Sequence, residues 1–68
     1  MEIIPGSVVR VKSLPFNVKF GEFDTGVVMR KDLLTGMLVV NMDSPAVDYA
    51  MMVPVPEINT WKNNLELV

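Results

Sequence analysis

Few residues in this sequence have side chains suited to catalysis. The 68 residues include no histidine and no cysteine, which excludes zinc sites built from those ligands. Without histidine, acid–base chemistry at neutral pH would need a pair of carboxylates or a lysine with a shifted pKa. Asp43 and Asp48 flank a predicted turn beside Ser44-Pro45 and are the best such pair. We interpret them as turn-forming residues and predict that the protein is not an enzyme.

The sequence predicts no metal and no cofactor. Glu22 and Asp24 in "GEFDTG" lack the ligand spacing of an EF-hand calcium loop. The four glycines are scattered at positions 6, 21, 26 and 36, so they form no phosphate-binding loop.

A nucleic-acid surface would need basic residues that paired strands bring together, and the candidates are Arg10, Lys12, Arg30 and Lys31. The whole chain has six basic and eight acidic residues and a net charge of −2. Nucleic-acid binders usually carry a clear basic excess, because they contact phosphates. We therefore favour a solvated face for these side chains and keep nucleic-acid binding as an alternative.

Apolar residues make a protein partner the better prediction. Half of the residues are hydrophobic, and a domain of this size buries only ~60% of its unfolded surface. Some apolar side chains should therefore meet a partner. Aromatic residues are frequent at interface hot spots, and methionine adapts to varied surfaces. The candidate partner-binding residues are Phe20, Phe23, Trp61, Met51 and Met52.

Each candidate also has a structural interpretation. Phe20 and Phe23 fit a core position as well as a surface one, and the neighbouring Phe16 is expected to cap the core. Trp61 fits a plug over the open end of a barrel. Met51 and Met52 are adjacent in a predicted strand, so one should be buried and the other exposed.

Short runs of β-branched residues between turns predict an all-β domain over residues 1–68. Strands are expected at 7–13, 25–31, 37–43, 49–55 and 65–68, with a long loop at 14–24 and turns at 32–36 and 44–48. A single turn of 3₁₀-helix is expected within 56–64. Pro54 has no N–H to donate, so it must lie at a strand end or on a sheet edge.

Alternation within the strands predicts the core. The residues expected to be buried are Val9, Val11, Val28, Leu38, Val40, Val53, Leu65 and Leu67, and Met42 shares the face of Leu38 and Val40. The last strand would close the barrel and cover an exposed sheet edge.

The order of these elements resembles a five-stranded SH3-like barrel with a 3₁₀ turn before the last strand. The segments "PGSVVRVKSLPF" and "TGVV" resemble KOW domains, in which a glycine opens a valine-rich strand, a Pro-Phe pair follows, and a glycine introduces the next strand. The matching residues are Gly6, Val9, Val11, Pro15, Phe16, Gly26 and Val28. Leu14 stands where that family usually has glycine. The early "GS-V-R" and late "NN-L" patterns are more weakly similar to the photosystem I subunit IV family.

The leading hypothesis is a small accessory or inhibitory protein that docks on a larger protein complex. The KOW resemblance implies the alternative, a nucleic-acid-binding domain linked to transcription or translation. A self-associating structural subunit is the third hypothesis. No apolar run approaches the ~20 residues of a membrane span, and the N-terminus lacks the pattern of a signal peptide. We therefore expect a soluble cytoplasmic protein.

Overall fold

The computed structural model describes residues 2–68, and their regular structure consists of β-strands and one 3₁₀ turn. The elements in chain order are β1 Val8–Val11, β2 Val18–Lys19, β3 Thr25–Lys31, β4 Leu38–Asp48, β5 Val53–Thr60, η1 Lys62–Asn64 and β6 Leu65–Leu67. The predicted all-β class is confirmed.

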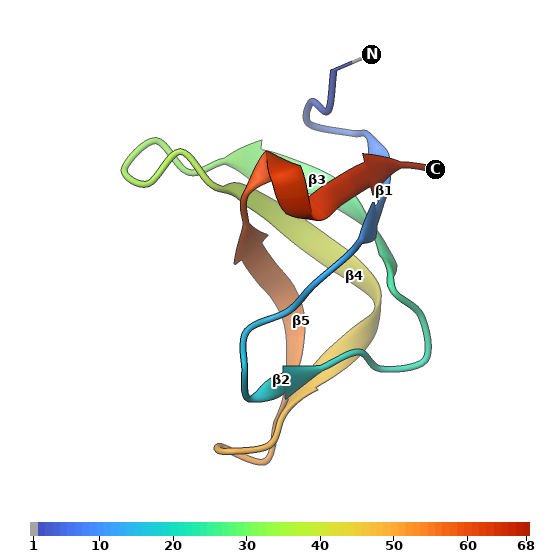
Figure 1. Cartoon of the computed structure of the whole chain (residues 1–68), viewed down its shortest axis with the longest axis vertical. Helices are drawn as coiled ribbons and strands as arrows, with labels where there is room; N and C mark the ends of the chain where they lie inside the picture. The colour runs from blue at the N-terminus through green and yellow to red at the C-terminus, as the bar shows by residue number, and fades with distance from the viewer. Residues whose placement is uncertain (1) are drawn as a thin grey trace.

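Strand β4 is the centre of a single antiparallel sheet (Figure 1). Along one edge it pairs first with β3 and then with β2, and along the other it pairs with β5. Strand β1 lies between β3 and β6. At 11 residues, β4 is the longest strand, and it therefore reaches from one end of the molecule towards the other.

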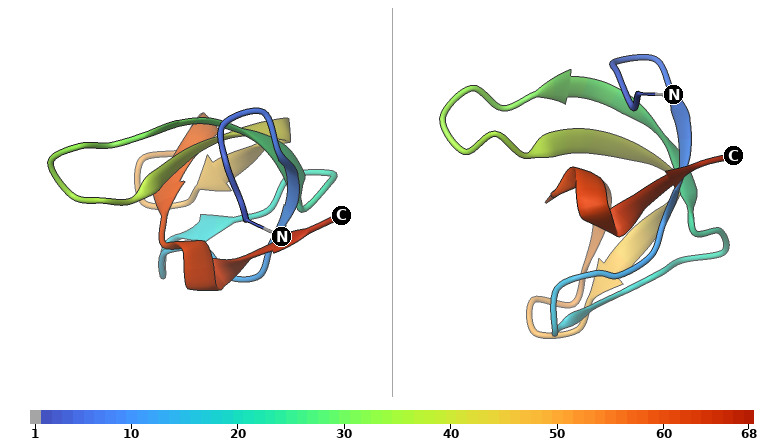
Figure 2. Two further views of the ribbon diagram at one scale, coloured as in Figure 1. Left: turned by 90° about the horizontal axis from the view of Figure 1, so that it is seen from above. Right: turned by 45° about the horizontal axis from the view of Figure 1, so that its top comes forward.

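The sheet curls around its core, and η1 joins the two outer strands β5 and β6 (Figure 2). Within residues 2–68, β5 and β6 do not pair with each other, so the sheet is open between these two strands. The sequence predicted five strands in a closed or nearly closed barrel, whereas residues 2–68 form six strands in a sheet that is not closed. The additional strand is β2, which has only two residues and lies inside the predicted loop 14–24.

The largest error in the predicted boundaries concerns the turn at 44–48. These residues belong to β4, and the chain reverses direction at residues 49–52 instead. Pro45 is tolerated in the strand because it lies where the register of β4 against β5 shifts, between Asn41 and Ala46. Consequently β5 starts at Val53 rather than at residue 49 and extends to Thr60, and the single 3₁₀ turn expected within 56–64 lies at the end of that segment, in η1.

The predicted core is confirmed at most positions. Val9, Val11, Val28, Leu38, Val40, Met42 and Leu65 form the buried cluster together with Ile58. Leu67 is half-buried, and Val53 is 45% exposed, because it opens the edge strand β5 beside the turn. The prediction omitted four buried hydrophobic residues, Val18, Val39, Ala46 and Ile58, and the buried Thr60.

Gly26 allows β3 to cross close to β4. An added Cβ at this position would lie 2.5 Å from the Asn41 carbonyl oxygen and 2.9 Å from Val40 Cγ1. No real side chain fits at such distances, so the curl of the sheet depends on glycine here. No helix among residues 2–68 is long and apolar enough to cross a membrane.

Candidate functional site

The turn between β4 and β5 is held by a single carboxylate. Asp48 Oδ1 accepts hydrogen bonds from the backbone N–H groups of Ala50 and Met51, at 2.9 and 3.1 Å, and from Asn17 Nδ2 at 2.8 Å. Its backbone carbonyl accepts a hydrogen bond from the Met52 N–H at 2.7 Å. Aspartate commonly organises turns through bonds to the N–H groups that follow it. Residues 49–52 are therefore ordered before any partner arrives.

Met52 has an unusual backbone conformation within this turn. Its φ of 56° is the only positive value at a non-glycine position among residues 2–68. A side chain in this region costs roughly 1–2 kcal/mol relative to an ordinary conformation. Strain of this kind is frequently found at functional positions.

The pairing of β2 with β4 brings aromatic residues to the same turn. Val18 lies opposite Asp48, and the Tyr49 N–H donates to the Asn17 carbonyl at 2.9 Å. The residues just before β2 therefore lie beside the turn. We call the surface formed by Phe16, Phe20, Tyr49, Met51 and Met52 the apolar end of the molecule.

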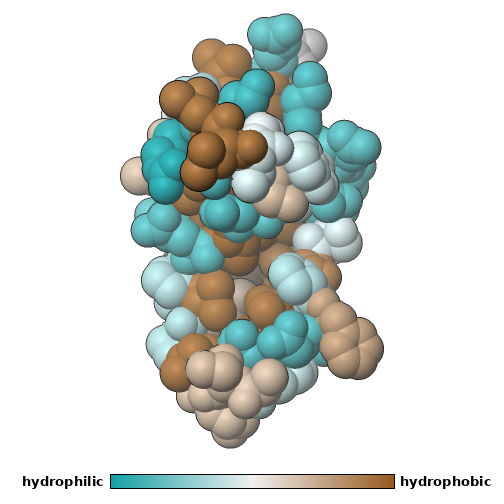
Figure 3. Space-filling model, turned by 90° about the vertical axis from the view of Figure 1, so that its left-hand side faces the viewer, coloured by the Kyte–Doolittle hydropathy of each residue, from teal (hydrophilic) through white to brown (hydrophobic). Residues whose placement is uncertain are grey.

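Side chains of the apolar end are exposed to solvent. Phe16 is 99% exposed, Met51 69% and Met52 78%. In the space-filling view, apolar residues cover most of the lower tip of the molecule (Figure 3). Phe16 and Phe20 also line a shallow hollow with Leu14, Pro15 and Val18.

Two predictions about these residues were wrong. Phe16 was expected to cap the core, but it lies in a tight turn closed by the bond from the Val18 N–H to the Pro15 carbonyl, which turns its ring outward. Met51 and Met52 were expected to face opposite sides of a strand. Both are exposed because they belong to the turn that precedes β5.

The other nominated residues lie elsewhere. Trp61 follows β5, whereas Met52 precedes it, so the two lie at opposite ends of a strand of eight residues, or roughly 26 Å. Phe23 is 52% exposed and lies in the segment from β2 to β3. Of the five nominated partner-binding residues, Met51 and Met52 therefore share the turn, and Phe20 joins this end of the molecule through the hollow that it lines with Phe16.

The four basic residues do not gather. Arg10 lies between two carboxylates, with Asp24 at 3.6 Å and Glu66 at 3.3 Å, so its charge is balanced locally. Arg10 pairs with Thr25 at the start of β3, whereas Arg30 and Lys31 end that strand, five residues or roughly 16 Å further on. Lys12 follows β1, which runs antiparallel to β3, so Lys12 lies still further from Arg30 and Lys31 than Arg10 does.

The two aspartates considered for catalysis are also separated. Asp43 accepts a hydrogen bond from Thr25 Oγ1 at 2.6 Å, in the strand region of β4, and Asp48 organises the turn. Within the part of the chain that the structure describes, no group of three acidic side chains could hold a metal ion.

Phe16 and Tyr49 were not among the predicted binding residues, and neither were two exposed leucines in the β3–β4 turn. Leu33 and Leu34 are more than nine-tenths exposed. Tyr49 follows Asp48 in "DYAMM". Because aspartate commonly begins a turn, this pattern could have predicted that Tyr49 lies in an exposed turn. The leucines were within a correctly predicted turn, which is itself a sign of exposure.

Comparison of the chain with protein-family models, with curated proteins and with solved structures found no match. The interpretation of the site therefore depends on its geometry. An ordered turn that exposes methionine and aromatic side chains is suited to burying apolar area against another surface, because little conformational freedom of the backbone remains to be lost.

Proposed function

We propose that this protein is a non-enzymatic binding module that docks on a protein partner through its apolar end. The observation that carries the proposal is the exposure of large apolar side chains on a turn ordered by Asp48. Apolar patches of this kind on small proteins commonly mark interaction sites. A larger protein complex is the partner we favour, with this chain as an accessory or inhibitory subunit.

An SH3-like barrel is the scaffold that we propose for this module. The chain order supports it, since a first strand, a long connection, three strands joined by short turns, a 3₁₀ turn and a short last strand follow one another. The pairing of the last strand β6 with the first strand β1 also supports it. This scaffold carries binding sites in many proteins but does not specify the ligand.

The partner can be identified by capture from a native lysate followed by mass spectrometry, and the contact surface by matched variants. Met51→Ser removes an exposed methionine from the apolar end, and Met29→Ser removes one that is 52% exposed on β3. We expect Met51→Ser to cost at least ~2 kcal/mol of partner affinity, the usual threshold for a hot spot. Met29→Ser should leave the affinity almost unchanged.

Two results would contradict the proposal. Equal losses of affinity in the two methionine variants would place the contact outside the apolar end. Capture of RNA or DNA, with binding abolished by Arg10→Glu and Lys12→Glu together but not by Met51→Ser, would replace it with the KOW-like alternative. Circular dichroism of each variant checks that the fold is kept.

A further inference from the structure

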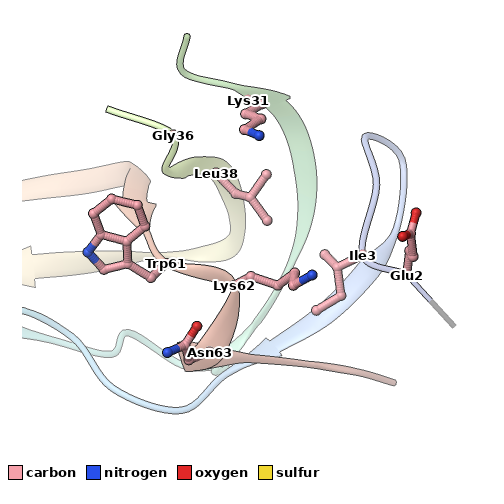
Figure 4. A pocket seen from close by; sticks show the side chains of 8 residues that line it. All are labelled: Glu2, Ile3, Lys31, Gly36, Leu38, Trp61, Lys62 and Asn63. Carbon is pink, nitrogen blue, oxygen red and sulfur yellow. The ribbon is translucent and has the colours of Figure 1, made fainter. Parts of the chain in front are cut away.

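A second hollow lies at the opposite end of β5 from the apolar end. It has a volume of about 290 Å³ and lies between the N-terminal segment, the β3–β4 hairpin and η1 (Figure 4). Small-molecule pockets usually start at ~300 Å³, so this space suits one or two side chains of a partner.

The base of this hollow is apolar and belongs to the core. Leu38 is 7% exposed and part of the buried cluster, and Ile3 packs against that cluster. The indole of Trp61 forms one side and is half exposed. An added Cβ at Gly36 would lie 3.6 Å from Trp61 Cζ3, so the hairpin backbone runs along the ring.

Two lysines reach this hollow from segments distant in the sequence. Lys31 ends β3, opposite Leu38, and Lys62 begins η1. Both line the hollow, and Figure 4 shows the Lys62 ammonium group beside Ile3, with Lys31 on the other side of the space, at the end of β3. Among residues 2–68, the ion pairs involve only Arg10, so neither ammonium group has a carboxylate partner within 4.0 Å. Glu2 is the one acidic residue on the lining.

We propose that this hollow binds an acidic peptide segment in which a carboxylate side chain adjoins an apolar one. The carboxylate pairs with the ammonium group of Lys62 or Lys31, and the apolar side chain covers Leu38 and the face of Trp61. Charge complementarity determines this choice, because the lining carries two lysines without ion-pair partners against a single acidic residue, Glu2. The ionic contacts should weaken with added salt.

This inference rests on the proposed function in one respect, that the ligand belongs to a protein. It concerns a different surface, so the two can fail separately. Loss of partner affinity in Met51→Ser tests the apolar end alone, and binding of an isolated acidic peptide tests the Trp61 hollow alone.

Trp61 is the only tryptophan in the chain, so its fluorescence reports on this hollow directly. The probe is a short acetylated and amidated peptide of alternating glutamate and leucine, and its control has glutamine in place of glutamate. We expect a saturable change in Trp61 emission with the glutamate peptide only. Amide signals of Gly36 and Lys62 should shift in the same titration, measured by NMR.

Matched lysine variants test the mechanism. Lys31→Gln with Lys62→Gln should weaken binding of the glutamate peptide about tenfold, since each exposed ion pair contributes modestly. Lys12→Gln with Lys19→Gln makes the same change in net charge on exposed residues outside this hollow and should leave the affinity unchanged.

Three outcomes would overturn the inference. The first is no saturable signal with the glutamate peptide. The second is an equal loss of affinity in the two lysine pairs, which would indicate attraction to overall charge. The third is a single-stranded RNA oligonucleotide that binds more tightly than the peptide and requires Lys31 and Lys62, which would assign the hollow to nucleic acid.

Discussion

At the scale of residues, Asp48 and Met52 determine how the apolar end is presented. The carboxylate of Asp48 satisfies two backbone N–H groups of the turn and the Asn17 amide, so it ties β2 to the β4–β5 turn. Met52 completes the turn with a positive φ, a conformation that glycine adopts without cost. A methionine in that position costs stability, which fits a side chain that contributes to binding.

Met52→Gly separates stability from binding. We expect the free energy of unfolding to rise by up to ~1 kcal/mol, because relief of the left-handed strain exceeds the added entropy of glycine in the unfolded chain. Affinity for the captured partner should fall, because the side chain is lost. Urea unfolding and a binding titration measure the two effects. A variant that is less stable and binds as well as the parent would mean that Met52 serves the fold only.

At the scale of elements, the outer strands explain how a sheet that is not closed avoids pairing with other chains. Within the described residues, β5 pairs only with β4, and it contains Pro54 and Pro56, which have no N–H to offer on the free edge. The predicted position of Pro54 on an edge is confirmed. These prolines disfavour the third hypothesis, association through edge strands, along β5.

Strand β6 protects the other side of the sheet. It covers the edge of β1 through pairs from Val9–Leu67 to Val11–Leu65, and Leu65 is buried in the core. Deletion of residues 65–68 should therefore expose both an edge and a core surface, and the truncated protein should unfold or aggregate. Thermal unfolding and size-exclusion chromatography measure this. An unchanged melting temperature would show that β6 contributes little to the fold.

At the scale of the whole molecule, the dispersal of the basic residues favours a protein partner over nucleic acid. Arg10 is balanced by Asp24 and Glu66, and the basic residues at the end of β3 lie far from it along the sheet. The molecule is 34 Å long, so its two candidate surfaces can contact separate parts of one partner.

Binding of the captured partner should depend weakly on the charges of β1. Arg10→Glu with Lys12→Glu should change mainly the association rate, because rim charges steer encounter more than they hold a complex together. A nucleic-acid ligand would instead give an affinity that falls steeply with salt, with a log–log slope of about −0.9 per duplex phosphate neutralised. Surface plasmon resonance at several salt concentrations distinguishes the two. A steep slope that this double variant abolishes would contradict the apolar docking mode.

The sequence by itself determined the all-β class, most of the core and the boundaries of β3, because alternation of apolar residues and turn-forming residues are local properties of the chain. Val9, Val11, Val28, Leu38, Val40 and Leu65 could be predicted in this way, and so could the turn at 32–36. The net charge alone also favoured a protein partner over nucleic acid, without any structure, and this preference stays a prediction.

The tertiary structure decided where β4 ends and which surface residues share a neighbourhood. Ser44-Pro45 looks like a turn locally, yet β4 continues through it because β2 and β5 pair with the residues that follow. That shift moved Met51 and Met52 from a strand into a turn and placed them beside Phe16, more than thirty residues earlier. Likewise, Lys31, Lys62 and Trp61 line one hollow only because the sheet curls until η1 reaches the end of β3. Such contacts depend on pairing between distant segments, which local sequence patterns do not encode.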